Sequence, residues 1–216
     1  TMVVVKDGLA ESNSQGESTR PSGADTTKSS ESVKATPSGE TSNVATSSTG
    51  KLGRRLSQQK LEDDPEFQAK LAEMEKKYPG QGFSKQKLYN TIKGESAFNT
   101  SARNKNTNAS GLFQFTQPAL DDINKKFGTN HTLQSVRSSS ATEQLGIYDQ
   151  YLERWNYNGS NELGIMQGAP AFANRSLSEV VYKEGSSAWK QNPGWRPTSG
   201  GDITVADMNN YYASQA

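Results

Sequence analysis

Residues 11–50 restrict where this chain can build a core. Eighteen of these 40 residues are Ser or Thr, none is aromatic, and two valines are the only large aliphatic side chains. Such a segment cannot bury enough apolar surface to offset the conformational entropy lost on ordering. The sequence therefore predicts a Ser/Thr-rich extended tail over residues 1–50, flexible or held by partner proteins, and one compact domain over residues 51–216.

Charge and composition exclude several classes of partner. The net charge is +1, with 24 basic and 23 acidic residues, so we expect binding neither to nucleic acid nor to anionic membrane. The chain has no cysteine, and its single histidine, His131, has no second ligand near it in sequence. We therefore expect no metal centre and no cofactor. No apolar stretch approaches the roughly 18 residues of a membrane span, so membrane insertion is not expected.

The apolar pattern predicts a mainly α fold. Period-two alternation is nearly absent, so any sheet should be a minor ribbon. Shorter helices are expected over Glu162–Gln167 and Leu177–Tyr182. Longer helices should begin where a capping residue precedes a periodic apolar run, at Asp64, Ser84, Thr116, Ser140 and Thr204.

The second of these helices carries a candidate catalytic acid. Leu88, Ile92 and Glu95 lie at i, i+4 and i+7, so the acid shares a face with apolar residues. Partial burial and the carbonyl end of the helix would both favour the protonated carboxyl group, which is the state that a general acid needs. The alternative is that Glu95 only marks the edge of an amphipathic face.

The stretch around Glu95, "KGESAFNTSARNKNTNASGLFQFTQP" (residues 93–118), resembles the signature of the soluble lytic transglycosylase family and, more loosely, of goose-type lysozymes. In that signature a catalytic Glu and a Ser precede an apolar residue, an Ala, a variable loop and a Gly-Leu-apolar-Gln-apolar run. The resemblance implies a lysozyme-like helical domain. The matching positions are Glu95, Ser96, Phe98, Ala102, Gly111, Leu112, Phe113, Gln114, Phe115 and Pro118.

Two parts of the chain depart from the family pattern. Thr100 replaces a frequent proline, which should loosen the turn without altering the chemistry. The third family motif, usually Ala-Tyr-Asn followed by Gly, is represented by "LGIMQGAPAFAN" (Leu163–Asn174). This segment keeps Gln167 and Gly168 and looks more like variants in virion-associated phage enzymes. The similarity covers about residues 84–213.

The resemblance implies a mechanism with one acid. Glu95 would protonate the glycosidic oxygen between N-acetylmuramic acid and N-acetylglucosamine, and the acetamido group of the substrate would stabilise the oxocarbenium-like centre. The ionised Glu95 would then deprotonate the muramyl C6 hydroxyl, which gives a 1,6-anhydro sugar. Hydrolytic glycosidases usually need two carboxylates, and near the motif the sequence has only Asp121 and Asp122, which open the following helix.

Supporting roles in substrate binding are also implied by the resemblance. Ser96 would steady the carboxylate or the acetamido group, and Gln167 would contact the reacting sugar. For Ser96 and Gln114, ordinary helix-end and loop hydrogen bonding is the alternative. Tyr148 and Trp155 are expected in the core. The remaining candidates for the sugar cleft are Phe113, Gln114, Phe115 and, by stacking, Tyr157.

Two other functions stay open. The same fold could act as a hydrolytic muramidase in which Asp149 or Glu162 activates water, or as a non-catalytic virion structural protein that binds glycan. Peptidoglycan lies outside the cytoplasm and no signal peptide is visible in this sequence. We therefore expect a virion protein of a phage tail or baseplate, bound to its neighbours through residues 1–50, that acts on glycan strands in the host periplasm or cell wall.

Overall fold

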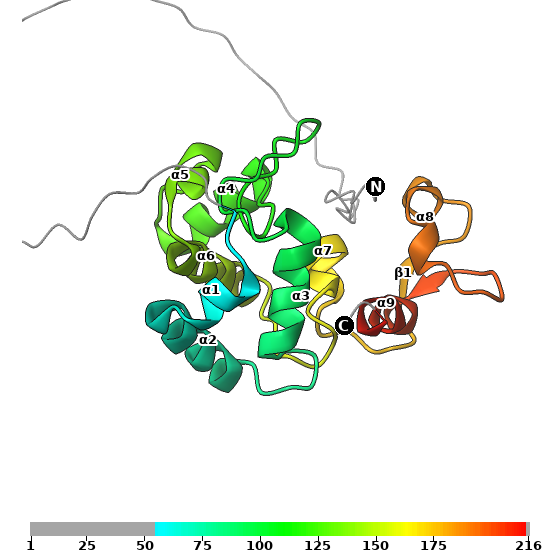
Figure 1. The fold of residues 1–216 in the computed structure, drawn as a ribbon. Coiled ribbons are helices and arrows are strands. Elements are labelled where there is room, and N and C mark those ends of the chain that lie inside the picture. The colour runs from blue at the N-terminus through cyan, green and yellow to red at the C-terminus, as the bar shows by residue number, and fades with distance from the viewer. Residues whose placement is uncertain (1–54, 215–216) are drawn as a thin grey trace, which may run out of the picture. The chain divides into compact units, whose positions relative to one another are not determined.

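The computed structural model describes residues 55–214, and helices dominate it (Figure 1). The tail predicted over residues 1–50 and the domain boundary predicted at residue 51 lie outside the described residues. Within residues 55–214, no helix is long and apolar enough to cross a membrane.

The described chain is mainly α, as predicted, with one two-stranded sheet. In chain order the elements are α1 (Gln58–Glu62), α2 (Pro65–Lys77), α3 (Lys85–Ser96), α4 (Gln117–Phe127), α5 (Leu133–Ser138), α6 (Ala141–Arg154), α7 (Ile165–Gly168), the 3-10 turn η1 (Pro170–Phe172), β1 (Val180–Tyr182), α8 (Ser187–Gln191), the 3-10 turn η2 (Pro193–Trp195), β2 (Ile203–Thr204) and α9 (Val205–Ala213).

The predicted starts of the longer helices are confirmed. The Asp64 side chain accepts hydrogen bonds from two backbone N–H groups in the first turn of α2, and Ser84 accepts one at α3. Ser140 and Thr204 each form a reciprocal capping box, at α6 and α9. Thr116 precedes α4 without a side-chain cap bond. Local side chains therefore determine where most of these helices begin.

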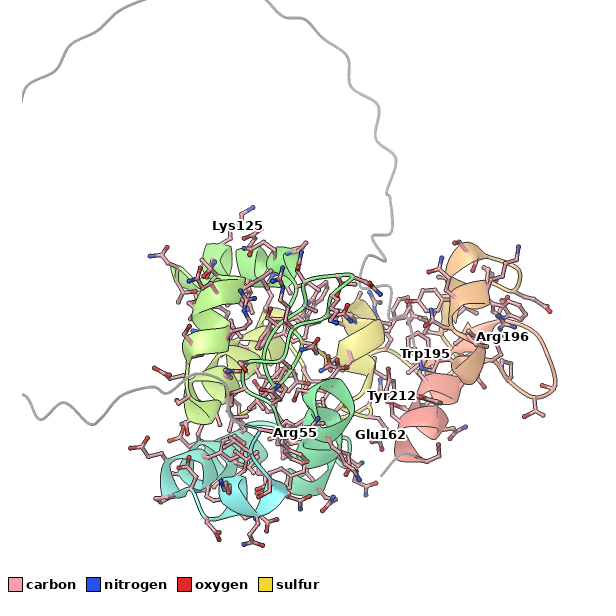
Figure 2. The ribbon with its side chains drawn as sticks, turned by 45° about the horizontal axis from the view of Figure 1, so that its top comes forward. Arg55, Lys125, Glu162, Trp195, Arg196 and Tyr212 are labelled. Carbon is pink, nitrogen blue, oxygen red and sulfur yellow. The ribbon has the colours of Figure 1, made fainter. Side chains whose placement is uncertain are left out.

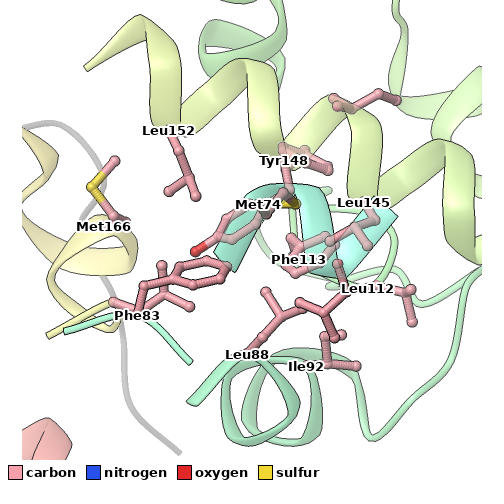
Figure 3. Packing of buried hydrophobic residues seen from close by; sticks show 14 of the residues in the cluster. Met74, Phe83, Leu88, Ile92, Leu112, Phe113, Leu145, Tyr148, Leu152 and Met166 are labelled. Carbon is pink, nitrogen blue, oxygen red and sulfur yellow. The ribbon is translucent and has the colours of Figure 1, made fainter. Parts of the chain in front are cut away.

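The larger group of buried side chains, which we call the main core, is built around α6. This helix packs against α2 and α4, and its residues Leu145, Tyr148 and Leu152 are almost completely buried. Figure 3 shows them among side chains from α2, α3 and the loop before α4, including Met74 and Phe113. One continuous core therefore joins the segments on both sides of Glu95.

A smaller group of buried side chains, the C-terminal core, lies beside the main core. α7 belongs to both groups: Met166 lies in the main core, whereas Ile165 and Ala169 lie in the C-terminal core. The short helix α7 therefore connects the two cores. The remaining buried members of the C-terminal core are Trp195, Ile203, Val205 and Met208.

The helix predicted over Leu177–Tyr182 is wrong. Val180–Tyr182 forms strand β1, which pairs antiparallel with Ile203–Thr204 in β2. The β-branched and aromatic residues of "VVY" favour a strand when a partner strand is present. The expected minor ribbon is thereby confirmed.

The helix predicted over Glu162–Gln167 begins later, at Ile165. The Glu162 backbone N–H donates to Asn209 Oδ1 at 2.8 Å, and that of Leu163 donates to the Gly82 carbonyl at 3.0 Å. Partners distant in sequence thus hold the backbone of the predicted first turn.

Gln144 on α6 holds two loops and α5 together from inside the core. Its Oε1 accepts from the Leu112 N–H at 2.7 Å, and its Nε2 donates to the Thr100 and Val136 carbonyls at 2.9 and 2.8 Å. Gly111 has a φ of 81°, and a Cβ there would overlap Gln144 Oε1. The glycine of the "GLFQF" run is therefore required by packing as well as by backbone conformation.

We predict that Gly111→Ala lowers the free energy of unfolding by about 1–3 kcal/mol, because the new methyl group must displace Gln144 in a close-packed core. Gly146→Ala is the matched control. Gly146 lies in α6, and the space that a methyl group would take there is open, so this substitution should be neutral or stabilise by up to about 1 kcal/mol. Urea unfolding of both variants measures the difference, and equal stability would contradict the proposed clash.

Candidate functional site

Glu95 is the next-to-last residue of α3 and is half-buried. Leu88 and Ile92, on the same helix face, are completely buried. The structure thus places the carboxyl group at the edge of the main core, as the helical spacing predicted, with part of its surface accessible.

The backbone adopts unusual conformations in two segments of the motif, the residues that follow Glu95 and the "GLFQF" run (residues 111–115). Ala97 and Phe98, which follow Glu95 and Ser96, have φ values of 48° and 61°, and Gln114 has a φ of 49°. Residues with a Cβ rarely adopt this left-handed conformation, which costs of order 1 kcal/mol each and is concentrated at functional sites. Three of the five non-glycine residues with positive φ in residues 55–214 lie in these segments.

Tyr148 connects the three motif segments. The Phe113 ring stacks on the Tyr148 ring at 4.0 Å and 3°, and Gln167 Nε2 donates to the Tyr148 hydroxyl at 3.1 Å. Burial raises the pKa of Tyr148, and the negative charge of Glu95 adds to this effect. Tyr148 is therefore a core residue, as expected, and it contacts both Phe113 of the "GLFQF" run and Gln167 of the segment Leu163–Asn174.

The charge of Glu95 also reaches two further tyrosines, Tyr151 on α6 and Tyr212 on α9. Burial raises the pKa of both Tyr151 and Tyr212, and in each case the charge of Glu95 raises it further. The Tyr151 hydroxyl donates to the Met166 carbonyl at 2.8 Å, and both rings remain half-buried.

Neither of these tyrosines is singled out by the sequence. Tyr151 follows Tyr148 by three residues on α6, and that helical spacing was a usable signal. Tyr212 lies on α9 and reaches the site only through the tertiary fold.

The polar side chains predicted to bind substrate make local hydrogen bonds. Ser96 Oγ donates to the Ile92 carbonyl of its own helix at 3.0 Å. Gln114 is buried, and its Nε2 donates to the Gly111 carbonyl at 3.0 Å. These are helix-end and loop bonds of the kind that the sequence left open as the alternative for both residues.

The aromatic side chains predicted to bind substrate are buried. Phe113 and Phe115 are 1% and 3% exposed and pack on Tyr148. Tyr157 is 4% exposed, contacts two other aromatic rings of the main core, and donates its hydroxyl to the Asn161 carbonyl at 2.9 Å. Phe113 and Phe115 thus pack beneath the surface of the candidate site. The Tyr157 ring is enclosed in the main core, so neither of its faces is exposed for stacking on a sugar.

Asp149, one of the two acids considered as a hydrolytic base, belongs to an ion-pair network. It accepts from Lys70 Nζ at 2.8 Å, Lys77 Nζ at 2.9 Å and the Tyr78 hydroxyl at 2.7 Å. Burial alone would raise the pKa of Asp149, but these hydrogen bonds together hold it below its ordinary value. Successive residues of a helix are about 100° apart around its axis, so Asp149 lies on a different face of α6 from Tyr148. Its carboxylate therefore stabilises the fold through the ion pairs with Lys70 and Lys77.

Glu162, the other acid considered, pairs with Lys87 Nζ at 2.7 Å. Lys87 lies eight residues before Glu95 on α3, which corresponds to about 12 Å along the helix axis. This ion pair therefore holds Glu162 near the opposite end of α3 from Glu95.

Asp122 is a third acid, and its charge reaches Tyr151. Its charge adds to the effects of burial and of Glu95 in raising the pKa of Tyr151, and its carboxylate pairs with Arg154 at 2.9 Å. The pKa of Tyr151 is thus raised by the charges of two carboxylates, Glu95 and Asp122. The sequence placed Asp122 only at the start of a helix.

No protein-family model matches this chain, and no curated protein is significantly similar to it. Among residues 55–214, no group of three or more His, Asp or Glu side chains is arranged to hold a metal ion. Functional inference therefore depends on the motif residues and on the surroundings of Glu95.

We predict that Asp149→Asn destabilises the protein by about 1–3 kcal/mol at pH 7, because Lys70 and Lys77 lose a buried charged acceptor. The pKa of Asp149 is lowered by folding, so its contribution to stability is present above about pH 4 and is lost as the pH falls below that value. The variant should therefore lose less stability than the wild type between pH 7 and pH 3, as measured by chemical denaturation.

The control for this prediction is Glu73→Gln. Glu73 is exposed and approaches Lys70 only at 3.6 Å, so its removal should change stability by less than about 0.5 kcal/mol. An equal effect of the two substitutions would contradict a structural role for Asp149.

Proposed function

We propose that this protein is a lytic transglycosylase with a lysozyme-like helical domain, which cleaves the β-1,4 bond between N-acetylmuramic acid and N-acetylglucosamine in peptidoglycan. The observation that carries the proposal is the setting of Glu95, a half-buried carboxyl group at the end of α3 whose charge raises the pKa of Tyr148, Tyr151 and Tyr212. The motif residues that match the family meet there through Tyr148.

In the proposed mechanism, Glu95 acts first as an acid and then as a base. It donates its proton to the glycosidic oxygen, the C1–O bond of the muramyl residue breaks, and the acetamido group of the substrate stabilises the cationic carbon. The carboxylate then accepts the proton of the muramyl C6 hydroxyl as that oxygen bonds to C1. Aromatic side chains around Glu95 limit access of water, which favours attack by this internal hydroxyl.

The supporting residues take different roles in this proposal. Gln167 acts through its hydrogen bond to Tyr148, and Phe113 and Phe115 act through their packing on the same ring. The half-buried Ser96 retains its proposed substrate contact, whereas the buried Gln114 acts through its hydrogen bond to the Gly111 carbonyl. Tyr157 is not retained, because its ring and hydroxyl are engaged in the core.

The setting that we propose is a phage tail or baseplate. The departures from the family pattern in Leu163–Asn174 support it, because they resemble virion-associated enzymes. The binding partners would be peptidoglycan glycan strands and, through residues 1–50, neighbouring tail or baseplate proteins. The enzyme would act in the periplasm or cell wall of the host.

Hydrolysis is the second candidate function, and Asp122 is the observation that favours it. The negative charge of Asp122 raises the pKa of Tyr151, as that of Glu95 does. An enzyme with two carboxylates near one scissile bond can activate water. The Arg154 ion pair holds the Asp122 side chain, and hydrolysis would require this carboxylate to act as the base.

We predict that Glu95→Gln abolishes the solubilisation of purified peptidoglycan while the melting temperature stays within a few degrees of wild type. The amide has the same shape but cannot transfer the proton, and a general acid-base group contributes about 10² to 10⁴ in rate. Asp122→Asn is the matched carboxylate-to-amide control and should retain at least half of the activity. More than a tenth of wild-type activity in Glu95→Gln would exclude Glu95 as the acid, and no activity in the wild type would favour the non-catalytic glycan-binding role.

We predict that mass spectrometry of the released muropeptides shows 1,6-anhydromuramic acid at the cleaved ends. This product is lighter than the hydrolytic one by the mass of one water, about 18 Da, because internal attack by the C6 hydroxyl adds no water. Reducing muramic acid as the main product, together with loss of activity in Asp122→Asn, would establish the hydrolytic mechanism instead.

A further inference from the structure

A groove of about 940 Å³ is lined by residues of α5, α6, and the end of α4 with the loop that follows it. That volume is in the range of ligand-binding sites in proteins. The lining includes Glu143, Gly146, Gln150 and Glu153, whose spacing places them on one face of α6. Tyr148 is two residues from Gln150, or about 200° around the helix axis, and so lies on the opposite face. The groove is therefore separate from the candidate site.

Four hydroxyl groups in the lining of the groove have their protons engaged within the protein. Each donates to a side-chain or backbone oxygen at 2.9–3.1 Å, so towards a ligand its own oxygen can only accept. A ligand that supplies several hydrogen-bond donors therefore fits this wall. The four groups are those of Thr129, Ser135, Ser138 and Ser139, and their acceptors are, in that order, Asn124 Oδ1 and the carbonyls of Thr132, Gln134 and Val136.

The carboxylates in the lining already have partners within the protein. Lys77 pairs with both Asp149 and Glu153, at 2.9 and 2.8 Å, and Glu143 accepts from the Ser140 N–H at 2.6 Å. A cationic ligand would have to compete with these partners. An anionic ligand would meet carboxylates and acceptor oxygens. The groove therefore favours a ligand that is neutral and rich in donors.

Gln150 and Gly146 give the groove a donor and an open floor. His131 Nε2 donates to Gln150 Oε1 at 3.2 Å, which leaves the amide nitrogen of Gln150 to donate to a ligand. The space around a Cβ at Gly146 is open, so packing does not require this glycine, although glycine is unfavourable within a helix. Phe127 is half-buried and adds apolar surface at the end of α4, where Figure 2 shows Lys125 pointing away from the fold.

We propose that this groove is a second, non-catalytic binding site for a neutral glycan strand. Sugar rings carry many hydroxyl donors around faces of C–H groups, which matches the acceptor oxygens of the wall and the apolar surface of Phe127. Glu143 and Glu153 are ten residues apart, or about 15 Å along the axis of α6, which suits a short oligosaccharide. The identification of this glycan as peptidoglycan rests on the proposed function. A domain that binds strands at two sites stays on the cell wall between cuts, because rebinding is then intramolecular.

The first test observes the groove directly and does not depend on activity. The full chain carrying Glu95→Gln, labelled with ¹⁵N, is titrated with the β-1,4-linked tetramer of N-acetylglucosamine at millimolar concentration. The side-chain amide resonance of Gln150 and the backbone resonances of Ser138 and Ser139 should shift in a saturable way. Inorganic phosphate and spermine, the anionic and cationic probes, should leave these resonances unchanged. A Gln150 resonance that ignores the tetramer, or that responds only to phosphate or spermine, overturns the proposal.

The second test fills the groove in the same Glu95→Gln background. Gly146→Gln places a long side chain on its floor and should weaken tetramer binding, followed at Ser138 and Ser139, by at least about tenfold, the scale of one or two lost hydrogen bonds. Gln150→Leu removes the donor and should weaken binding by about two- to tenfold. Ala72→Gln is the matched control, because Ala72 is an exposed position of α2 outside the lining, and it should leave the affinity unchanged. Unchanged affinity in both groove variants overturns the proposal.

These readouts separate the groove from the proposed function. A wild-type protein that cleaves peptidoglycan while the Gln150 resonance ignores the tetramer overturns the second site and leaves the enzyme proposal intact. A Gln150 resonance that responds to the tetramer, and no longer responds in a protein carrying Gly146→Gln, supports the groove as a glycan site. If that wild-type protein does not cleave peptidoglycan, the proposed function is overturned instead.

Discussion

The Gln144 side chain is the interaction on which the arrangement of the site depends. This buried amide binds the backbone on both sides of the variable loop, at Thr100 and Leu112, and at Val136 in α5. Without these bonds, several buried backbone groups would lack partners, which is costly in a core. Because Gln144 lies on α6 one turn before Tyr148, the same helix fixes both the loop and the ring on which Phe113 stacks.

Local chemistry explains which features could be predicted from the sequence. A capping side chain followed by a helical apolar period locates α2, α6 and α9, because both signals lie within a few residues. The helix face of Glu95 follows from the same periodicity. The strand β1 could not be recognised in the same way, because "VVY" is short and its partner strand lies about twenty residues later.

The composition of the site depends on contacts between distant residues. Tyr212 approaches the Gly164 backbone because α9 packs on α7, and this contact joins residues that are distant in the sequence. The two phenylalanines after Gly111 were expected to line the sugar cleft, but both are buried because they pack on Tyr148. Residue types in a motif therefore suggested a chemistry, whereas tertiary packing determines which of these side chains are exposed.

The connection of two cores through α7 also bears on the order in which the protein becomes functional during synthesis. All buried members of the main core lie between Leu61 and Ala173, so that core can assemble before the ribosome has made α9. Tyr212 is added later and must dock on a surface that already exists. A nascent chain would thus hold a folded main core before the C-terminal core closes on it.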